Sequence, residues 1–183
     1  MRIQLSRFYV CNKGGNMMEC LGCRLAGGEE KIYKVYEDDH VTCFLDHEPF
    51  YTGHTLIVPK QHVVEVDELD DVVAKSIMDA SKLIAKAIKA LYKPDGVTVC
   101  QNGGVFNELT HYHMHVVPRY KERSFAEFYM VQPGEKKNHN FEEAKNLLKE
   151  EIEQMVLVQI KDTFQRAMGI PIGIVLYAVN PNS

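Results

Sequence analysis

The sequence of 183 residues contains no apolar run long enough to cross a lipid bilayer, which takes about 20 residues in a helix. Its first 18 residues also lack the apolar stretch of about 7–15 residues that marks a secretory signal. The five cysteines are an odd number, and without an export signal they argue for a reducing compartment and against a disulfide framework. We therefore expect a cytoplasmic protein with no membrane partner.

An excess of positive charge is missing as well. The chain has 21 Lys and Arg against 25 Asp and Glu, for a formal net charge of −4. Nucleic-acid-binding proteins usually carry a basic patch or stripe, so no nucleic-acid partner is expected. The sequence shows no internal repeat and no low-complexity segment. Its apolar content of 45% is ordinary for a globular core, and its length suits one domain with extensions.

The pattern of apolar residues predicts five strands and two helices. The strands are expected at 31–36, 41–45, 53–60, 96–101 and 109–118, with a long helix at 67–92 and a second at 141–155. Acidic residues crowd the start of the long helix and lysines crowd its end, as the helix dipole favours. Strands, helix and further strands in this order predict an α+β domain with a mainly antiparallel sheet.

The two ends of the chain are expected to lie outside this domain. Residues 1–16 form an irregular extension in this interpretation, and Met17 or Met18 is a candidate for the true start. The domain is expected to cover residues 17–155. Residues 156–183 are rich in Ile, Val and Leu, and their strand-like part at 170–179 is too short to span a bilayer. This tail could pack on the domain, join a dimer, or extend away.

Three histidines alternate with apolar residues in the segment His111-Tyr112-His113-Met114-His115. In an extended strand the side-chain period is two, so all three imidazoles leave from one face, about 6.5–7 Å apart. Each imidazole can act as a nucleophile, a proton donor or a metal ligand. A metal clasp and a histidine tract on a solvated edge are the alternatives. The intervening apolar residues favour a packed strand with a reactive face.

Two further features accompany the histidines. The turn at Gly103-Gly104 lets backbone N–H groups approach an anion, although a plain hairpin turn has the same composition. Cys20 and Cys23 have the spacing of half a structural zinc site, for which His62 and His111 are candidate partners. A redox pair or two buried thiols would fit the same two cysteines. Cys43 and Cys100 lie in apolar strands and are expected to be inert.

The segment 111–117 resembles the signature of the histidine-triad (HIT) family, which is His, apolar, His, apolar, His and two apolar residues. The segments 36–38, 43–46 and 53–60, with His62, follow in the order and spacing of that family, so the resemblance runs from about Cys20 to Tyr120. The chain is most similar to bacterial members of the hydrolase branch with a CxxC zinc motif. The resemblance implies a HIT-like fold and a homodimer with residues 67–92 and 96–101 near the two-fold axis.

The activity implied by the resemblance is that of a nucleotide hydrolase or nucleotidyl transferase. It would act at the α-phosphate of a purine nucleotide derivative, a phosphoramidate or a dinucleoside polyphosphate, through a covalent nucleotidyl-histidine. His113 would be the nucleophile, His115 would contact the leaving-group side, and His54 would hold a phosphate oxygen. The implied nucleotide contacts are Phe44, Leu45, Asp46, Asn102, Gly103, Asn107 and Glu108. The implied ligands of a structural zinc are Cys20, Cys23, His62 and His111.

Glu108 is a departure from the family pattern. Many members have Ser or Thr at this position, and an ionised carboxylate cannot supply the proton that such a hydroxyl donates. This difference favours an alternative function, a nucleotide-binding regulatory protein with little turnover. A third hypothesis, in which all three triad histidines bind one catalytic metal ion, is disfavoured because residues 116–118 cannot coordinate a metal.

Overall fold

A computed structural model describes residues 20–122, 124, 126 and 139–168. The elements are α1 (Leu21–Gly27), β1 (Lys34–Glu37), β2 (Val41–Leu45), β3 (Thr55–Pro59), the 3-10 turn η2 (Val66–Glu68), α2 (Asp71–Tyr92), β4 (Gly96–Gln101), the 3-10 turn η3 (Gly104–Phe106), β5 (Met114–Arg119) and α4 (Phe141–Met168). The extension predicted at 1–16 and the strand-like segment at 170–179 lie outside the described residues.

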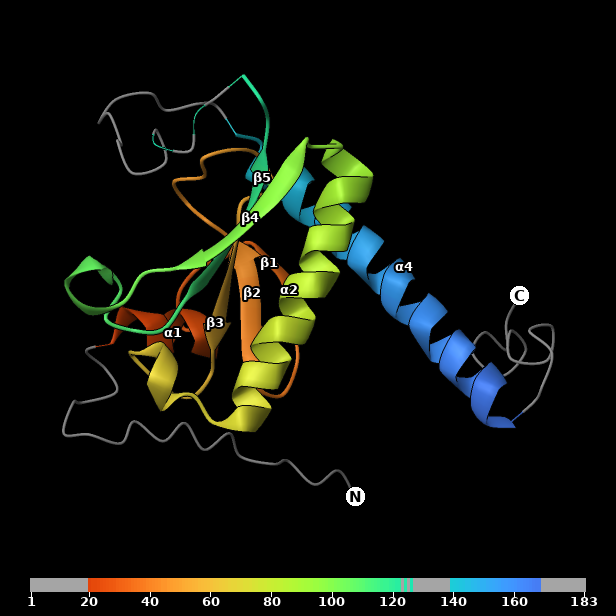
Figure 1. The fold of residues 1–183 in the computed structure, drawn as a ribbon, viewed down its shortest axis with the longest axis horizontal. Coiled ribbons are helices and arrows are strands. Elements are labelled where there is room, and N and C mark those ends of the chain that lie inside the picture. Colours follow the sequence, from red (N-terminus) through yellow and green to blue (C-terminus); the bar gives the residue numbers. More distant parts are fainter. Residues whose placement is uncertain (1–19, 123, 125, 127–138, 169–183) are drawn as a thin grey trace.

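The five strands form one antiparallel sheet in the order β1-β2-β3-β5-β4, which confirms the predicted fold class. Strand β5 lies between β3 and β4 although it follows both in the sequence. Figure 1 shows α2 and α4 together on one face of the sheet. Helix α1 packs against the other face. Among the described residues, neither of these two long helices has the apolar length that a membrane span requires.

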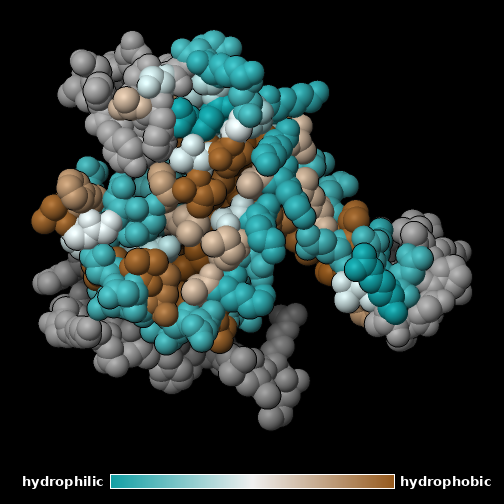
Figure 2. Space-filling view, in the orientation of Figure 1, coloured by the Kyte–Doolittle hydropathy of each residue, from teal (hydrophilic) through white to brown (hydrophobic). Residues whose placement is uncertain are grey.

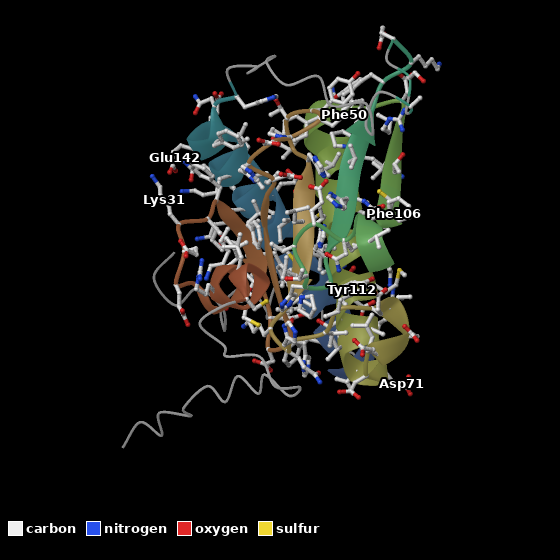
Figure 3. All side chains as sticks on the ribbon, turned by 90° about the vertical axis from the view of Figure 1, so that its left-hand side faces the viewer. Lys31, Phe50, Asp71, Phe106, Tyr112 and Glu142 are labelled. Carbon is white, nitrogen blue, oxygen red and sulfur yellow. The ribbon has the colours of Figure 1, made fainter. Side chains whose placement is uncertain are left out.

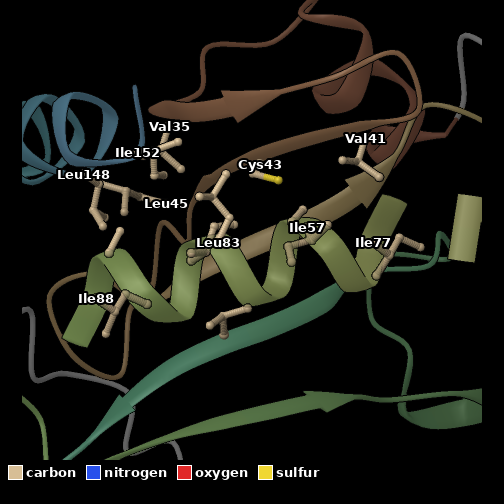
Figure 4. Close-up of a cluster of buried hydrophobic side chains, with 14 of the residues drawn as sticks. Val35, Val41, Cys43, Leu45, Ile57, Ile77, Leu83, Ile88, Leu148 and Ile152 are labelled. Carbon is tan, nitrogen blue, oxygen red and sulfur yellow. The ribbon is translucent and has the colours of Figure 1, made fainter. Parts of the chain in front are cut away.

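The main core lies between the sheet and the helices α2 and α4. Figure 4 shows side chains of β2 and β3 pointing toward α2, with residues of α4 closing one end of the cluster. Ile57, Ile84 and Ile88 are fully buried there. A smaller cluster joins Ala26 of α1 to Phe44, Leu56 and Val58 on the other face of the sheet. Strand β2 is buried at all five positions because both of its faces are covered.

Two predicted boundaries before the histidines were wrong. The long helix begins at Asp71, since residues 66–68 form a separate 3-10 turn capped by Glu65 and Glu68. The last strand begins at Met114, so the segment 109–113 precedes the sheet. Thr110 has a left-handed φ of 50°, a conformation that interrupts an extended strand. His111 and His113 are therefore held by contacts outside the strand ladder.

The second helix was predicted to end near Met155, but it continues to Met168. No glycine or proline occurs between Phe141 and Gly169, so nothing in the sequence stops the helix earlier. The expected domain boundary at 155 thus falls inside a continuous helix. The Ile- and Val-rich residues 156–160 belong to that helix rather than to a separate tail.

The two halves of α4 have different surroundings. In the first half Ala144, Leu148 and Ile152 are buried in the main core. In the second half Ile160 and Phe164 are 43% and 52% exposed, and Figure 1 shows this half projecting beyond the sheet and α2. The direction in which the apolar side chains point also changes between the two halves, by roughly a third of a turn at 100° per residue. The contribution of α4 to the domain core therefore ends near Val156.

A matched pair of substitutions on α4 tests this division. Leu148→Ala removes a fully buried side chain, and we expect it to lower the free energy of unfolding by about 2–5 kcal/mol. Leu157→Ala removes the same atoms at a position that is 44% exposed, and we expect a change within about 0.5 kcal/mol. Urea unfolding followed by circular dichroism measures both values. Equal losses for the two variants would contradict the division.

Candidate functional site

The pairing of strands places the triad on the sheet face opposite α2. His115 lies directly across from Leu56 of β3 and Cys100 of β4, and directly opposite residues share a face. Tyr112 and Met114 pack in or against the main core on the other face. The alternation predicted from the sequence therefore holds, although two of the three histidines precede the strand.

Four side chains form a compact cluster at the start of α1, which we call the thiol-histidine cluster: Cys20, Cys23, His62 and His111. The Cys20 and Cys23 sulfurs lie 3.4 and 3.6 Å from the His111 Nδ1 atom, and the Cys23 sulfur lies 3.3 Å from the His62 Nδ1 atom. A tetrahedral zinc ion with ordinary bond lengths places its sulfur and nitrogen ligands about 3.5 Å apart. These three distances, with all four donor atoms within 4.8 Å of one another, suit a tetrahedral zinc ion.

Backbone contacts set the protonation of His111. Its Nε2 atom lies 2.9 Å from the Pro59 carbonyl oxygen, which can only accept, so Nε2 carries the proton. The Nδ1 lone pair is left to face the two sulfurs. Burial lowers the pKa of His111 to about 4, so the ring is neutral at pH 7. A neutral imidazole with a free lone pair is the form that ligates zinc.

Gly22 lets α1 approach His111 this closely. A Cβ atom at position 22 would lie 2.3 Å from the His111 Cβ atom, well inside contact distance. The glycine of the Cys-Leu-Gly-Cys segment is therefore required by the position of His111, which lies 89 positions later in the chain. The spacing of the cysteines alone gave no indication of this requirement.

His113 is fixed by the backbone of His111. Its Nδ1 atom donates to the His111 carbonyl oxygen at 2.9 Å, so in the neutral ring the lone pair is on Nε2. The His113 side chain is buried, and its ring lies 4.9 Å from the ring of His115, nearly perpendicular to it. This arrangement presents a single nucleophilic nitrogen in a fixed orientation.

Behind the triad lies a second cluster, the Asp46-His54-His115 cluster. The His54 Nε2 atom is 3.0 Å from the His115 Nδ1 atom and 3.5 Å from a carboxylate oxygen of Asp46. Burial is the largest cause of a lowered pKa in both rings, to about 3 for His115, where the neighbouring histidines lower it further. His54 is only 2% exposed, and its Nε2 atom is directed at these two neighbours.

The glycine turn before the triad does hold an anion, and that anion is a side chain. The Gly104 N–H donates to the Glu65 carboxylate at 2.9 Å, and a Cβ atom at Gly103 would lie 2.5 Å from the same carboxylate. The predicted contact of this turn with a nucleotide stays a prediction, and the contact with Glu65 was not predicted. The pattern Glu65-x-x-Glu68 signals the cap of η2. No local signal reveals the contact with Gly104.

The remaining residues predicted to contact a nucleotide do not all lie on the sheet face of His115. Phe44 shares the sheet face of His115, whereas strand alternation turns the Leu45 side chain into the main core. A contact between Leu45 and a nucleotide stays a prediction. The Asn107 amide is engaged within the loops, since it donates to the Val64 carbonyl and accepts from the Leu109 N–H. Asn102 is half-buried at the end of β4, and Glu108 is exposed.

Residues 63–65 hold the segment that leads to the triad, and sequence reasoning missed all three. The Tyr112 N–H donates to the Val63 carbonyl at 2.6 Å, beside the Val64 and Glu65 contacts described above. Figure 3 shows the two sides of this loop, with Phe106 at the margin of the molecule and Tyr112 within it. Because His62 immediately precedes this stretch, the thiol-histidine cluster and the loop are mechanically connected.

The sequence of this chain is similar to those of several known proteins. A protein named "Protein hit" from Bacillus subtilis is 41% identical over 103 residues, which are 55% of this chain and 71% of the relative. A protein named adenylylsulfatase HINT3 from Arabidopsis thaliana is 35% identical over 107 residues, which are 57% of this chain and 54% of the relative.

Solved structures are similar to this chain as well. The crystal structure of a Zn-bound histidine triad family protein from Mycobacterium smegmatis superposes with a TM-score of 0.64 and 27% identity, covering 78% of this chain and 99% of that one. A family model described as "HIT domain" matches residues 28–122, which include β1 to β5 and all three triad histidines. With its fold, its alternating histidines and its relatives in agreement, this chain belongs to the HIT domain family.

Proposed function

We propose that the protein is a nucleotide hydrolase or nucleotidyl transferase that acts at the α-phosphate of a purine nucleotide derivative through a nucleotidyl-histidine. The observation that carries the proposal is the hydrogen bond from His113 Nδ1 to the His111 carbonyl oxygen. It leaves the Nε2 lone pair of a buried imidazole as the nucleophile. One relative is named an adenylylsulfatase, which fits chemistry at an adenylyl phosphate.

The proposed reaction has two steps. His113 Nε2 attacks the phosphorus, the bond from phosphorus to the leaving oxygen or nitrogen breaks, and the leaving group departs with the bonding electrons. Water then attacks the phosphorus and gives up a proton to the solvent, the bond to His113 breaks, and the products are a nucleoside monophosphate and the restored imidazole. Splitting one difficult displacement into two easier ones is the advantage of covalent catalysis. Nearby donors stabilise the charge on the phosphoryl oxygens.

The residues around the triad are assigned roles on the same basis. Phe44 supplies apolar surface for the base, and Asp46 accepts from the ribose hydroxyls. Asn102 and the backbone at Gly103 lie at the end of β4, where they would contact phosphate or ribose. The alternative, a nucleotide-binding regulatory protein with little turnover, is favoured by Glu108, which replaces a hydroxyl donor with a carboxylate. A turnover measurement separates the two.

Removing the nucleophile tests the proposed function. We expect His113→Ala to lower kcat by about three orders of magnitude or more while changing nucleotide affinity much less. His40→Ala, which removes an exposed imidazole outside the site, is the matched control and should keep wild-type turnover. Mass spectrometry with a slow adenylyl phosphoramidate should find an added nucleotidyl group on His113. Full activity of His113→Ala would refute the mechanism.

We also propose that Cys20, Cys23, His62 and His111 hold one structural zinc ion. When bound, the ion would cross-link α1 to the segments that end β3 and begin the triad. Its role would be structural, because all four ligands come from the protein and leave no open position for a substrate. The Zn-bound relative supports this assignment.

Metal analysis tests the zinc site. Protein purified without added metal should contain about one zinc ion per chain, and chelation should lower its melting temperature because ligand binding and folding are coupled. Cys23→Ser should lose the metal, whereas Cys11→Ser should retain it. Wild-type protein that contains no metal and whose stability is unaffected by chelators would rule the site out.

A homodimer through β4 is the third part of the proposal. Among the described strands β4 is an edge of the sheet, and Val99 on it is 46% exposed. Met78 of α2 is 53% exposed, and Figure 2 shows apolar surface over the middle of this face, where β4 crosses it. An edge strand with apolar side chains pairs readily with another strand, and a two-fold axis lets both copies pair at once.

Light scattering tests the dimer. We expect the dimer mass at micromolar concentration, and we expect Val99→Lys to shift the protein toward the monomer by placing two like charges near the axis. Val158→Lys is the matched control, since it changes a similarly exposed valine on the second half of α4. A monomer mass for the wild-type protein would refute the dimer.

A further inference from the structure

The turn between β4 and η3 is built around the carboxylate of Glu65. One oxygen of this carboxylate accepts a hydrogen bond from the Gly104 N–H at 2.9 Å. The other oxygen lies where a side chain at position 103 would begin, since a Cβ atom on Gly103 would be 2.5 Å from it. Gly104 itself has a left-handed φ of 57°. Both glycines are therefore needed for the turn to fit around the carboxylate.

The Glu65 side chain also belongs to a second turn. It precedes η2, whose capping box joins it to the backbone of Glu68. Capping needs contacts within η2 alone, so it does not explain the hydrogen bond with Gly104, which lies 39 positions later. A carboxylate has two acceptor oxygens, so one side chain can hold backbone N–H groups of both turns. Glu65 thus joins η2 to η3.

A competing explanation is that Glu65 fills a phosphate site and is displaced when a nucleotide binds. A carboxylate on the backbone of a glycine turn does resemble a bound anion. Two neighbouring contacts argue against displacement. The Val64 carbonyl accepts from the Asn107 side chain at 3.2 Å, and the Val63 carbonyl accepts from the Tyr112 N–H at 2.6 Å. Three consecutive residues hold this loop, so the contact of Glu65 belongs to a continuous attachment.

We propose that Glu65 is a positioning residue that holds the turn at residues 102–104 in the conformation that meets the nucleotide. This inference rests on the proposed function, in which Asn102 and the Gly103 backbone contact phosphate or ribose. The Asn102 carbonyl is held by the Gln101 side chain, which donates to it at 2.6 Å. Glu65 holds the other side of the turn at Gly104. Asn102 therefore lies between two fixed points, and nucleotide binding does not have to order it.

The expected effect of Glu65 is on nucleotide affinity and not on the chemical step. The turn carries no part of the nucleophile His113, whose ring is held by the His111 carbonyl. Loss of a contact that serves substrate and transition state equally raises KM and leaves kcat unchanged. The two explanations thus predict opposite signs. Removing a positioning residue weakens nucleotide binding, whereas removing a competing anion strengthens it.

Substitutions at position 65 distinguish these signs. We expect Glu65→Ala to raise KM, and the dissociation constant of AMP measured by calorimetry, about tenfold, with kcat changed less than about threefold. Glu65→Gln keeps one acceptor oxygen for the Gly104 N–H and should stay within about threefold of the wild type. Asp67→Ala removes an exposed acid from the same turn η2 and is the matched control, which should equal the wild type. A lower KM in Glu65→Ala would overturn the proposal in favour of displacement.

Gly103 provides an independent test from the other side of the contact. Its φ of −112° suits alanine, but the added methyl group would displace the carboxylate. Gly103→Ala should therefore weaken AMP binding to the same extent as Glu65→Ala. The double variant has no carboxylate to displace, so the two effects should not add. Additive losses would mean that the methyl group acts on the nucleotide directly, and they would refute the positioning role.

Amide exchange tests the contact without any ligand. The Gly104 amide should exchange slowly in the wild type, and Glu65→Ala should raise its exchange rate about tenfold or more while the amides of β5 stay unchanged. If wild-type protein binds no AMP and turns over nothing, the proposed function fails, and amide exchange alone decides whether Glu65 organises the turn. If AMP binds and Glu65→Ala leaves its affinity unchanged, the positioning role fails alone. An unchanged Gly104 exchange rate in Glu65→Ala would also overturn it.

Discussion

The geometry of the site depends on His111. Its ring has contacts with a backbone carbonyl and with two sulfurs, and its own carbonyl holds the ring of His113. Its ring is pinned between the Pro59 carbonyl and the two cysteine sulfurs. Its own carbonyl then fixes the ring of His113. A displacement of His111 moves the His113 ring with it, since a hydrogen bond joins the His111 carbonyl to that ring. The thiol-histidine cluster therefore sets the position of the His113 ring as well as that of His111.

The thiol-histidine cluster is also connected to the loop before the triad, through the backbone between His62 and η2. Three successive residues, Val63 to Glu65, each hold the loop that leads to the triad, at Tyr112, Asn107 and Gly104 respectively. Loops that carry reactive groups are ordinarily the most mobile parts of a fold. Here such a loop is fixed at both ends and near its middle. The entropy cost of ordering this loop is therefore incurred during folding rather than when a ligand binds.

Much of this could be predicted from the sequence, because the signals were local. The period-two alternation placed Tyr112 in the core and the histidines on the other face, and the helical spacing identified α2. Contacts between distant residues had no local signal. Glu65 meets Gly104 across 39 positions, and Gly22 makes room for His111 across 89. The error at α4 had another cause, since an apolar segment suits a strand or a helix until a breaker residue decides.

Strand order has a consequence for how the site comes into being. Among the described strands β4 pairs only with β5, and β5 is the last strand to leave the ribosome. The β4 strand is therefore joined to the rest of the sheet only through β5. The pairing of β5 with β3 that joins the two parts of the sheet also brings His115 beside His54. The contact between these two histidines and the completed sheet therefore depend on the same strand pairing, and a chain in which β5 is unpaired has neither.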